Sequence, residues 1–379
     1  MTSLMWVHSR LALRTTTASK ASLTSLRRLP VAVASSHTHA YSTSTSTSGP
    51  GSSSSAADII SAWKTSILKK PVLLERDTIR PQTLQMLLMT LNKSSPTTLP
   101  STTTTATATA NSNNTSSFQK GSPLPVNWHH IFFPPMIGEQ DLGQDGYEMT
   151  HAPPAPFLAR MWAGGGVEQN PRNLLRVGQE MVMKTKCTGV DIKQSREGKV
   201  MVFVSLEKSI ENEHGWALTD TRTLVYMEKE KEGSPVKPKL VKPRRQADIT
   251  LNVHPTAIQL FRYSALTFNS HRIHFDHEYA NNVEDHPACL VHGPLSATLM
   301  LEPLRQLLFQ QPGKIIKNFR YRALSPLYVD QPIQICAKKM TLIPTMDADV
   351  VESFEVWVEN PQGGLAMSGT VEVVQEPID

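Results

Sequence analysis

Three histidines lie at three-residue spacing in the segment FNSHRIHFDHEYA, residues 268–280. They are His271, His274 and His277, with Asn269 and Asp276 beside them. Imidazole side chains bind zinc or transfer protons near neutral pH. In a helix, residues i and i+6 point apart, and in a strand odd steps alternate between the two faces. No cysteine lies nearby, so the spacing favours proton transfer and predicts no metal site.

His274 is the candidate general base of this segment, and Asn269 lies five residues before it. The amide of Asn269 can hold a water or hydroxyl group, but an amide cannot donate and accept a proton as a carboxylic acid can. Asp276 is a candidate substitute acid, although capping a helix is the commoner role for such a carboxylate. His271 and His277 are expected to form local structure or the wall of a pocket.

Other catalytic motifs are absent from the sequence. It contains no GxSxG nucleophile elbow, no GxxxxGK[ST] phosphate loop and no GxGxxG dinucleotide motif. The AGGG at residues 163–166 lacks the strand–turn–helix spacing of a dinucleotide site, and we expect it to form a turn together with Trp162.

A helix and four strands are predicted to position the histidine segment. Residues 292–310 carry leucines at four- and five-residue steps, and Pro294 stands at the start. Pro303 lies inside this pattern and predicts a kink. The segments that follow read as strands: GKIIKNFRYRAL, PIQICAKKMTLI, VVESFEVWVEN and LAMSGTVEVV. The fold class is therefore α+β, with an antiparallel sheet that wraps a long helix.

An earlier unit is predicted over residues 71–228, with a low-complexity insertion at 94–122 and a linker at 229–246 that precedes a second unit at 247–379. A helical pattern follows Pro81. Three strand patterns are spaced as in a meander: MVMKTKCTGVDI, KVMVFVSLEK and ALTDTRTLVYM.

The first 57 of the 379 residues resemble a mitochondrial presequence. They hold five of the 38 Lys and Arg residues and no Asp or Glu, so the remainder carries 33 basic against 33 acidic residues. This balance argues against a nucleic-acid partner. No apolar run is long enough to span a membrane. Three widely spaced cysteines indicate a reducing compartment rather than a disulfide framework or a zinc site.

Separated blocks of the chain carry a family resemblance. FRYSALTFNSHRIHFDHEYA at 261–280, followed by LVHGPLSATLMLEPL at 290–304, resembles the hydratase motif of MaoC-like hotdog dehydratases. NWHHIFFPP and RMWAGGGVEQNPRNLLRVGQ are similar to the first half of the same proteins. The nearer likeness is to hydroxyacyl-thioester dehydratase type 2 and mesaconyl-C4-CoA hydratase. The general motif has an aspartate at the position of Asn269, which leaves the acid unassigned.

The resemblance implies two hotdog units in one chain, with the catalytic pair His274 and Asn269 in the second unit only. It implies reversible dehydration of (3R)-3-hydroxyacyl thioesters to trans-2-enoyl thioesters, without a metal or redox cofactor. The amide of Gly293, beside His292 at the start of the long helix, would bind the thioester carbonyl, and glycine would admit the substrate closely.

The substrate implied by the resemblance is a thioester of an acyl carrier protein or of coenzyme A. The presequence favours the dehydratase of mitochondrial type II fatty acid biosynthesis, located in the matrix. One alternative is a hydratase of dicarboxylyl-CoA such as mesaconyl-CoA, which would need a cation from Arg160, Arg262 or Arg272. A third hypothesis, supported by Asn269, is a non-catalytic thioester-binding protein. The acyl chain length and the oligomeric state stay open.

Overall fold

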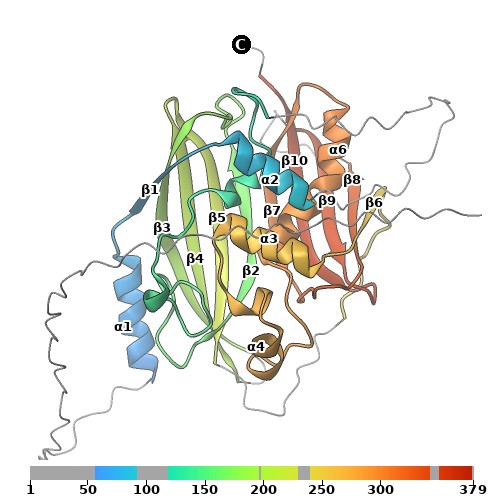
Figure 1. The fold of residues 1–379 in the computed structure, drawn as a ribbon. Helices are drawn as coiled ribbons and strands as arrows, with labels where there is room; N and C mark the ends of the chain where they lie inside the picture. The colour runs from blue at the N-terminus through green and yellow to red at the C-terminus, as the bar shows by residue number, and fades with distance from the viewer. Residues whose placement is uncertain (1–55, 92–117, 196–197, 229–239, 342–349, 378–379) are drawn as a thin grey trace, which may run out of the picture. The chain divides into compact units, whose positions relative to one another are not determined.

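The computed structural model describes residues 56–91, 118–195, 198–228, 240–341 and 350–377. These residues form an antiparallel sheet of ten strands in the order β1-β3-β4-β5-β2-β7-β10-β9-β8-β6 (Figure 1). The N-terminal half comprises β1 (Leu73–Thr78), β2 (Ala159–Gln169), β3 (Glu180–Gln194), β4 (Val200–Asn212) and β5 (Gly215–Met227). The C-terminal half comprises β6 (Ile249–Val253), β7 (Lys314–Ala323), β8 (Ile333–Met340), β9 (Val350–Glu359) and β10 (Leu365–Gln375).

The two halves repeat one topology. In each half the strands lie in the spatial order first, third, fourth, fifth, second, counted along the chain. The halves meet where their second strands, β2 and β7, pair. Both predicted meanders are confirmed as β3–β5 and β8–β10.

The central helix of the C-terminal half consists of α5 (Gly293–Met300) and α6 (Glu302–Phe309), which are separated at Leu301. Pro303 lies in the first turn of α6, so the predicted kink is confirmed. The helices pack on β8 and β9, and Leu295, Leu299, Met300 and Leu304 are buried in the core that these strands share. This core fills the concave face of the C-terminal half.

The AGGG segment does not form the expected turn, because it lies inside β2 at the junction of the halves. A Cβ on Gly164 would lie 2.5 Å from the carbonyl oxygen of Tyr321, and one on Gly165 would lie 2.3 Å from that of Thr221. The glycines therefore permit a close approach of neighbouring strands rather than a change of chain direction.

Two helices cover the ends of the N-terminal half. α1 (Ala56–Leu68) packs on β3, where Ile60 and Ile67 join an apolar cluster with Val202 and Val204. α2 (Pro81–Leu91), the helix predicted after Pro81, packs against α3 (Ala257–Thr267) of the other half. Between these ends, the described residues place no α-helix over the concave face of β3–β5, and the short 3-10 helix η1 (Trp128–Ile131) contacts β5 through His129 and His130.

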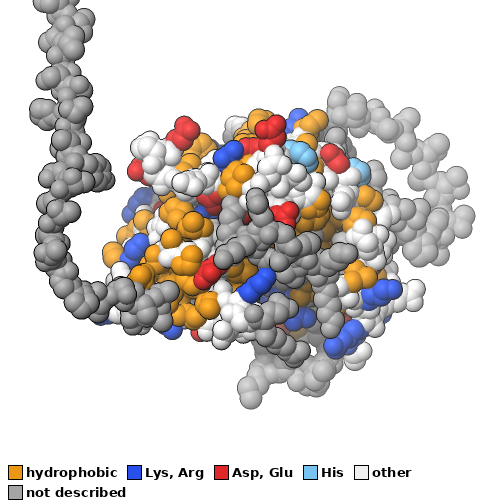
Figure 2. Space-filling model, turned by 90° about the horizontal axis from the view of Figure 1, so that it is seen from below, with side chains coloured by type: hydrophobic (Ala, Val, Ile, Leu, Met, Phe, Trp, Pro, Cys, Tyr) orange, Lys and Arg blue, Asp and Glu red, His pale blue; other side chains and the backbone are white. Residues whose placement is uncertain are grey.

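Several predicted segments lie outside the described residues. They include the presequence up to its last two positions, which begin α1, and most of the insertion at 94–122 and of the linker at 229–246. The three cysteines are buried and unpaired. In the described part of the chain, no helix is both long and apolar enough to cross a membrane. On the face in Figure 2, acidic and basic side chains are interspersed and do not gather by sign.

Candidate active site

A left-handed turn after α3 presents Asn269. Phe268 ends α3 with φ 51°, and the backbone N–H of Asn269 donates to the carbonyl of Ser264 at 2.9 Å. The side-chain Oδ1 of Asn269 accepts the backbone N–H of His271 at 3.0 Å. The amide is therefore held by its oxygen, and its NH₂ group is the part left for another partner.

His274 is held as a neutral imidazole with one free nitrogen. It ends the short 3-10 helix η3 (Arg272–His274), and its Nδ1 lies 2.9 Å from the carbonyl oxygen of Leu290. A carbonyl only accepts, so Nδ1 carries the proton and Nε2 keeps a lone pair. Burial lowers the pKa of His274 to about 4, although the bond to Leu290 opposes this shift. The ring is thus unprotonated near neutral pH and can act as a base.

His292 supports the His274 ring from behind. The two imidazoles stack with centroids 3.7 Å apart at 21°, and His292 is fully buried. Its Nε2 lies 2.8 Å from Oγ of Ser264. Burial holds the pKa of His292 well below its usual value, and the adjacent His274 lowers it further. The geometry would suit a positioning role for His292, and the predicted contact with the substrate stays a prediction.

Gly293 begins α5, so its backbone amide is at a helix N-terminus. A Cβ at this position would lie 2.7 Å from Cγ and 2.8 Å from Cβ of Trp162, which reaches across from β2. Glycine is therefore needed at this position because Trp162 of the N-terminal half packs directly against it. Pro294, the next residue, lines the adjoining cavity.

The two other histidines of the segment differ from His274. His271 is buried, with Nε2 3.3 Å from Oδ2 of Asp145 and its ring against Tyr147. His277 is exposed at the start of α4 (His277–Asn282), and Asp276 caps this helix by accepting the N–H of Tyr279. Asp276 is thus the capping carboxylate rather than a substitute acid.

Of the three arginines considered as partners for a dicarboxylate, two form ion pairs within the chain and one lies away from the cavity. Arg160 lies 2.8 Å from Oδ2 of Asp145, and Arg272 lies 2.8 Å from Oδ2 of Asp276. Arg262 is exposed and does not line the cavity. The sequence reasoning missed Asp145 because its partners lie in distant segments.

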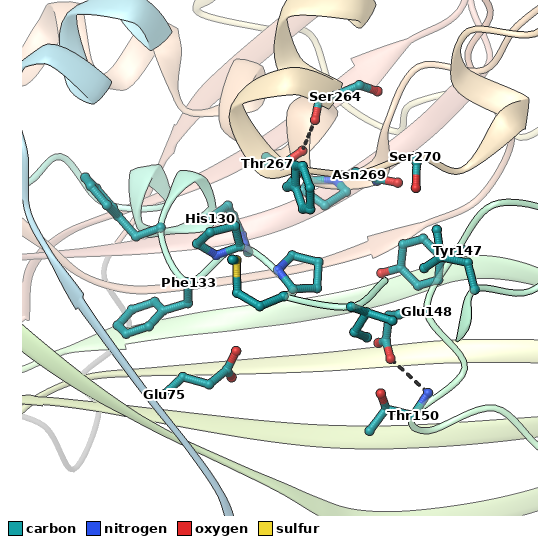
Figure 3. A pocket seen from close by; sticks show the side chains of 18 of the residues that line it. Glu75, His130, Phe133, Tyr147, Glu148, Thr150, Ser264, Thr267, Asn269 and Ser270 are labelled. Carbon is teal, nitrogen blue, oxygen red and sulfur yellow. Dashed lines mark hydrogen bonds between the residues drawn. The ribbon is translucent and has the colours of Figure 1, made fainter. Parts of the chain in front are cut away.

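A cavity of about 1470 Å³ extends from the end of α3 to the strands of the N-terminal half (Figure 3). Asn269 and Ser270 line it on one side, and Glu75 and Thr150 lie across from them. His274, His292 and Gly293 do not line it themselves. They adjoin its wall, since His292 contacts Ser264 and Gly293 precedes Pro294.

A second polar cluster lies at the cavity in the N-terminal half. Nε and Nη2 of Arg222 lie 2.7 and 2.6 Å from Oδ2 of Asp220, and Nη2 lies 2.9 Å from Nδ1 of His130. Ligand atoms of His129, His130 and Asp220 lie within 4.8 Å of one another, as a metal site would require. The guanidinium already supplies the cation there, so the cluster does not fit a metal ion.

Hydrogen bonds link this cluster to α5. Arg222 must donate, so Nδ1 of His130 accepts and its Nε2 donates to Oδ1 of Asn127 at 3.1 Å. Nδ2 of Asn127 donates to Oγ1 of Thr298 at 2.8 Å, and that hydroxyl donates to the carbonyl of Pro294. Burial lowers the pKa of His130 well below its usual value, which agrees with a neutral ring.

A family model described as hydroxyacyl-thioester dehydratase type 2 matches residues 127–329. The match covers more than half of the chain and every site residue named above except Glu75. The chain belongs to the hydroxyacyl-thioester dehydratase type 2 family. Membership makes it a hydro-lyase and confirms the resemblance read from the sequence.

Curated relatives of this dehydratase agree. Mesaconyl-C(4)-CoA hydratase of Chloroflexus aurantiacus is 33% identical over 257 residues, which are 66% of this chain and 84% of that protein. Mitochondrial hydroxyacyl-thioester dehydratase type 2 of Schizosaccharomyces pombe is 30% identical over 239 residues, 57% of this chain and 78% of that protein.

Solved structures confirm the double hotdog fold. A MaoC-like dehydratase from Phytophthora capsici matches 82% of this chain and 98% of its own, with a TM-score of 0.53 at 16% identity. HtdX from Mycobacterium tuberculosis matches 79–80% of this chain and 99% of its own, with a TM-score of 0.51.

Proposed function

We propose that the chain catalyses reversible dehydration of (3R)-3-hydroxyacyl thioesters to trans-2-enoyl thioesters, with His274 as the acid-base residue. The observation that supports this most directly is the state of His274. Its ring is neutral, its Nδ1 proton is fixed on Leu290, and its Nε2 is the nitrogen left for a substrate.

In the dehydration direction, Nε2 of His274 removes the proton from C2 of the acyl group. The negative charge that develops on the thioester oxygen is stabilised by the amide of Gly293 at the start of α5. The C3–O bond then breaks, and the imidazolium returns its proton to the departing hydroxyl, so that water leaves and the base is restored. No second acid is needed.

Asn269 has a role that its hydrogen bonding defines. Because Oδ1 accepts the N–H of His271, the NH₂ group is free to donate to the substrate hydroxyl or to the water that is added in the reverse direction. A donor suits an oxygen that gains negative charge as C–O bond cleavage proceeds. This accounts for an asparagine where the general motif has an aspartate.

Hydration of crotonyl-CoA, followed by loss of enoyl absorbance, tests the reaction. We expect water addition, formation of the (3R)-alcohol, and exchange of the C2 hydrogen of the alcohol with deuterium from the solvent. A protein that binds acyl thioesters but shows neither hydration nor C2 exchange would instead be the non-catalytic thioester-binding protein.

We further propose that the carrier is an acyl carrier protein and that the chain serves mitochondrial type II fatty acid biosynthesis in the matrix. The basic, acid-free first 57 residues and the mitochondrial relatives support this. A fluorescent fusion of residues 1–57 should enter mitochondria. A higher kcat/KM for 3-hydroxyoctanoyl thioesters on the carrier protein than on coenzyme A should follow.

A second candidate function is hydration of a short dicarboxylyl-CoA. The specific observation in its favour is that Lys208 and Arg222 line the cavity in the N-terminal half. The relative from Chloroflexus aurantiacus is named for such a substrate. A higher kcat/KM for mesaconyl-CoA than for 3-hydroxyoctanoyl thioesters would replace the lipid-synthesis role and leave the chemistry at His274 unchanged.

A further inference from the structure

The concave floor of the N-terminal half changes from apolar to polar at one level. On β4, Lys208 stands between Ile210 and Leu206, and on β3, Thr185 stands between Met183 and Cys187. Thr185 pairs with Lys208, and Lys208 with Asp220 on β5, so these side chains form one row across three strands. We call Thr185, Lys208, Asp220 and Arg222 the polar row.

The apolar residues on either side of the polar row pack against other parts of the fold, although Met183 and Leu206 also line the cavity. One set packs with α1, and the other joins the core that includes α2. The polar row lies between them at the cavity, which Thr185, Lys208 and Arg222 line. In the C-terminal half, the buried residues of β9 and β10 beside the helices are apolar: Phe354, Val356, Val358, Val371 and Val373. The polar row is thus a feature of the N-terminal half, whose concave face holds the cavity.

Lys208 is a largely buried cation without a carboxylate partner. Its Nζ contacts Oγ1 of Thr185 at 3.2 Å and Sδ of Met183 at 3.9 Å. Among the residues that the structure describes, none forms an ion pair with it. The carboxyl groups of Glu75, Asp220 and Glu148 act on the lysine only from longer range, and Glu75 also bonds Thr185. Burial lowers the pKa of Lys208 to about 8. An unpaired, desolvated ammonium is costly unless an anion joins it.

Arg222 offers a second donor at the same level. Asp220 and His130 fix its Nε and Nη2, and its side chain keeps 20% of its surface exposed. Within the described ranges, no residue accepts a hydrogen bond from Nη1. The guanidinium also lies 5.6 Å from the ring of Trp162, the residue that contacts Gly293. It therefore lies between the thioester end of the site and the floor.

We propose that Lys208, Thr185 and Arg222 form a subsite for a carboxylate at the leading end of the acyl group. The inference rests on the proposed thioester reaction and develops its second candidate, a dicarboxylyl thioester, by naming the groups that would bind the far carboxylate. A hydrocarbon tail would be served by an apolar floor, which avoids the desolvation of a lysine. A carboxylate supplies the missing anion and accepts bonds from both cations.

The position of the polar row indicates that its anion would come from the acyl group rather than from the phosphates of the carrier. A carrier protein is too large for the cavity and stays at its mouth, so the acyl group is the part that enters. Lys208 lies well inside β4, with β3 and β5 on its two sides, and the leading end of the acyl group is the part that reaches it.

The test compares trans-2-enoyl-CoA thioesters with their ω-carboxylates over a series of chain lengths. In the unaltered protein, we expect kcat/KM to favour the ω-carboxylate at one length. Lys208→Met should lower that preference ratio roughly 10- to 100-fold, the range a charge-assisted hydrogen bond supplies. Lys208→Arg, which keeps the charge, should retain part of the preference. Thr185→Val should lower it less than Lys208→Met.

The matched control is Lys184→Met. Lys184 precedes Thr185 on β3, points to the other face of the sheet and pairs with Glu211 at 2.6 Å. Its removal should leave the preference ratio as it is. The same comparison on N-acetylcysteamine thioesters, which lack phosphates, separates the two sources of an anion.

The proposal is overturned by any of three results. They are no preference for an ω-carboxylate at any length, an equal loss on both substrate series, or a loss that disappears without phosphates. Calorimetric binding of saturated acyl-CoA and its ω-carboxylate gives a readout without turnover. If no thioester is turned over, the proposed reaction fails, yet a Lys208-dependent difference in Kd would still support the subsite, and its absence would refute it.

Discussion

The two halves of the sheet share one strand order and differ in what lies on the concave face. In the C-terminal half, α5 and α6 fill that face with buried leucines, and the start of α5 fixes Gly293 beside His292. In the N-terminal half, α1 and α2 cover only the ends, and the middle is a cavity above the polar row. We call the C-terminal half filled and the N-terminal half hollow. In the proposed mechanism the filled half would hold the base, and the hollow half would provide room for the acyl group.

The difference shows how one topology can divide two tasks. A packed helix immobilises side chains in the way a general base requires, but it leaves no room for a ligand. The halves remain joined by Trp162 on Gly293 and by the hydrogen bonds from Arg222 through His130 and Asn127 to Thr298. The proposed acyl site and the proposed catalytic site are therefore linked by direct contacts.

The largest expected effect is on kcat and comes from the filled half. His274→Ala removes the base and should lower kcat by about 10²- to 10⁴-fold, the usual contribution of a positioned general base. His130→Ala, at the cavity of the hollow half, should cost less because its ring is a positioning residue. Exposed His277→Ala is the control and should match the unaltered enzyme. Steady-state hydration of crotonyl-CoA measures all three, and equal losses for His130→Ala and His274→Ala would contradict the division of tasks.

Packing should differ between the halves in the same direction. Leu295→Ala in α5, where the side chain is fully buried, should lower the free energy of unfolding by about 2–5 kcal/mol because it leaves an enclosed void. Leu206→Ala should cost less, since Leu206 already faces the cavity. Chemical denaturation with linear extrapolation gives both values. If Leu206→Ala were the more costly change, the N-terminal half would have to be packed as tightly as the other.

The sequence predicted the filled half better than the hollow one. Leucine spacing, Pro303 and the meander patterns follow from local periodicity, so the kinked helix and the strands were predicted correctly. The AGGG segment was misread because strand glycines that permit close approach look like turn glycines without their neighbours. The polar row could not be predicted, since Lys208 and Arg222 meet only through the pairing of β4 and β5.

Within the site, Asn269 and His274 could be singled out because they lie close in sequence and share a motif. The support from Trp162 and Ser264 could not be predicted, because β2 and α3 must first fold against α5. His292 was assigned to the substrate because the resemblance places the HGP segment there. The stacked arrangement with His274 depends on the path from Leu290 into α5, which periodicity does not specify.

A single added methyl group should disrupt the contact between the halves at Gly293 and Trp162. Gly293→Ala places a methyl group within 3 Å of Trp162 and should shift the oxyanion donor, with a loss in kcat/KM of up to roughly 100-fold. In a Trp162→Ala background the same change should cost less, because the obstructing ring is gone. Kinetics of the two single variants and the double variant give the coupling. Additive losses would mean that the tryptophan does not determine the place of Gly293.

The smallest expected effect is a dependence of stability on pH that arises mainly in the filled half. Burial lowers the pKa of His274 to about 4, and those of His271 and His292 fall well below their usual values. The unfolded chain therefore binds more protons than the folded one as pH falls below about 6.5, and the free energy of unfolding should decline from there toward pH 4. In the hollow half, burial also lowers the pKa of His130, which adds to this decline. Asp220 has a lowered pKa and loses its contribution only below its ordinary value of 3.8. Urea denaturation between pH 7 and 5 measures the decline. His292→Phe keeps a stacked ring without a titrating group and should flatten it, whereas an unchanged slope would place the proton uptake outside the stacked pair.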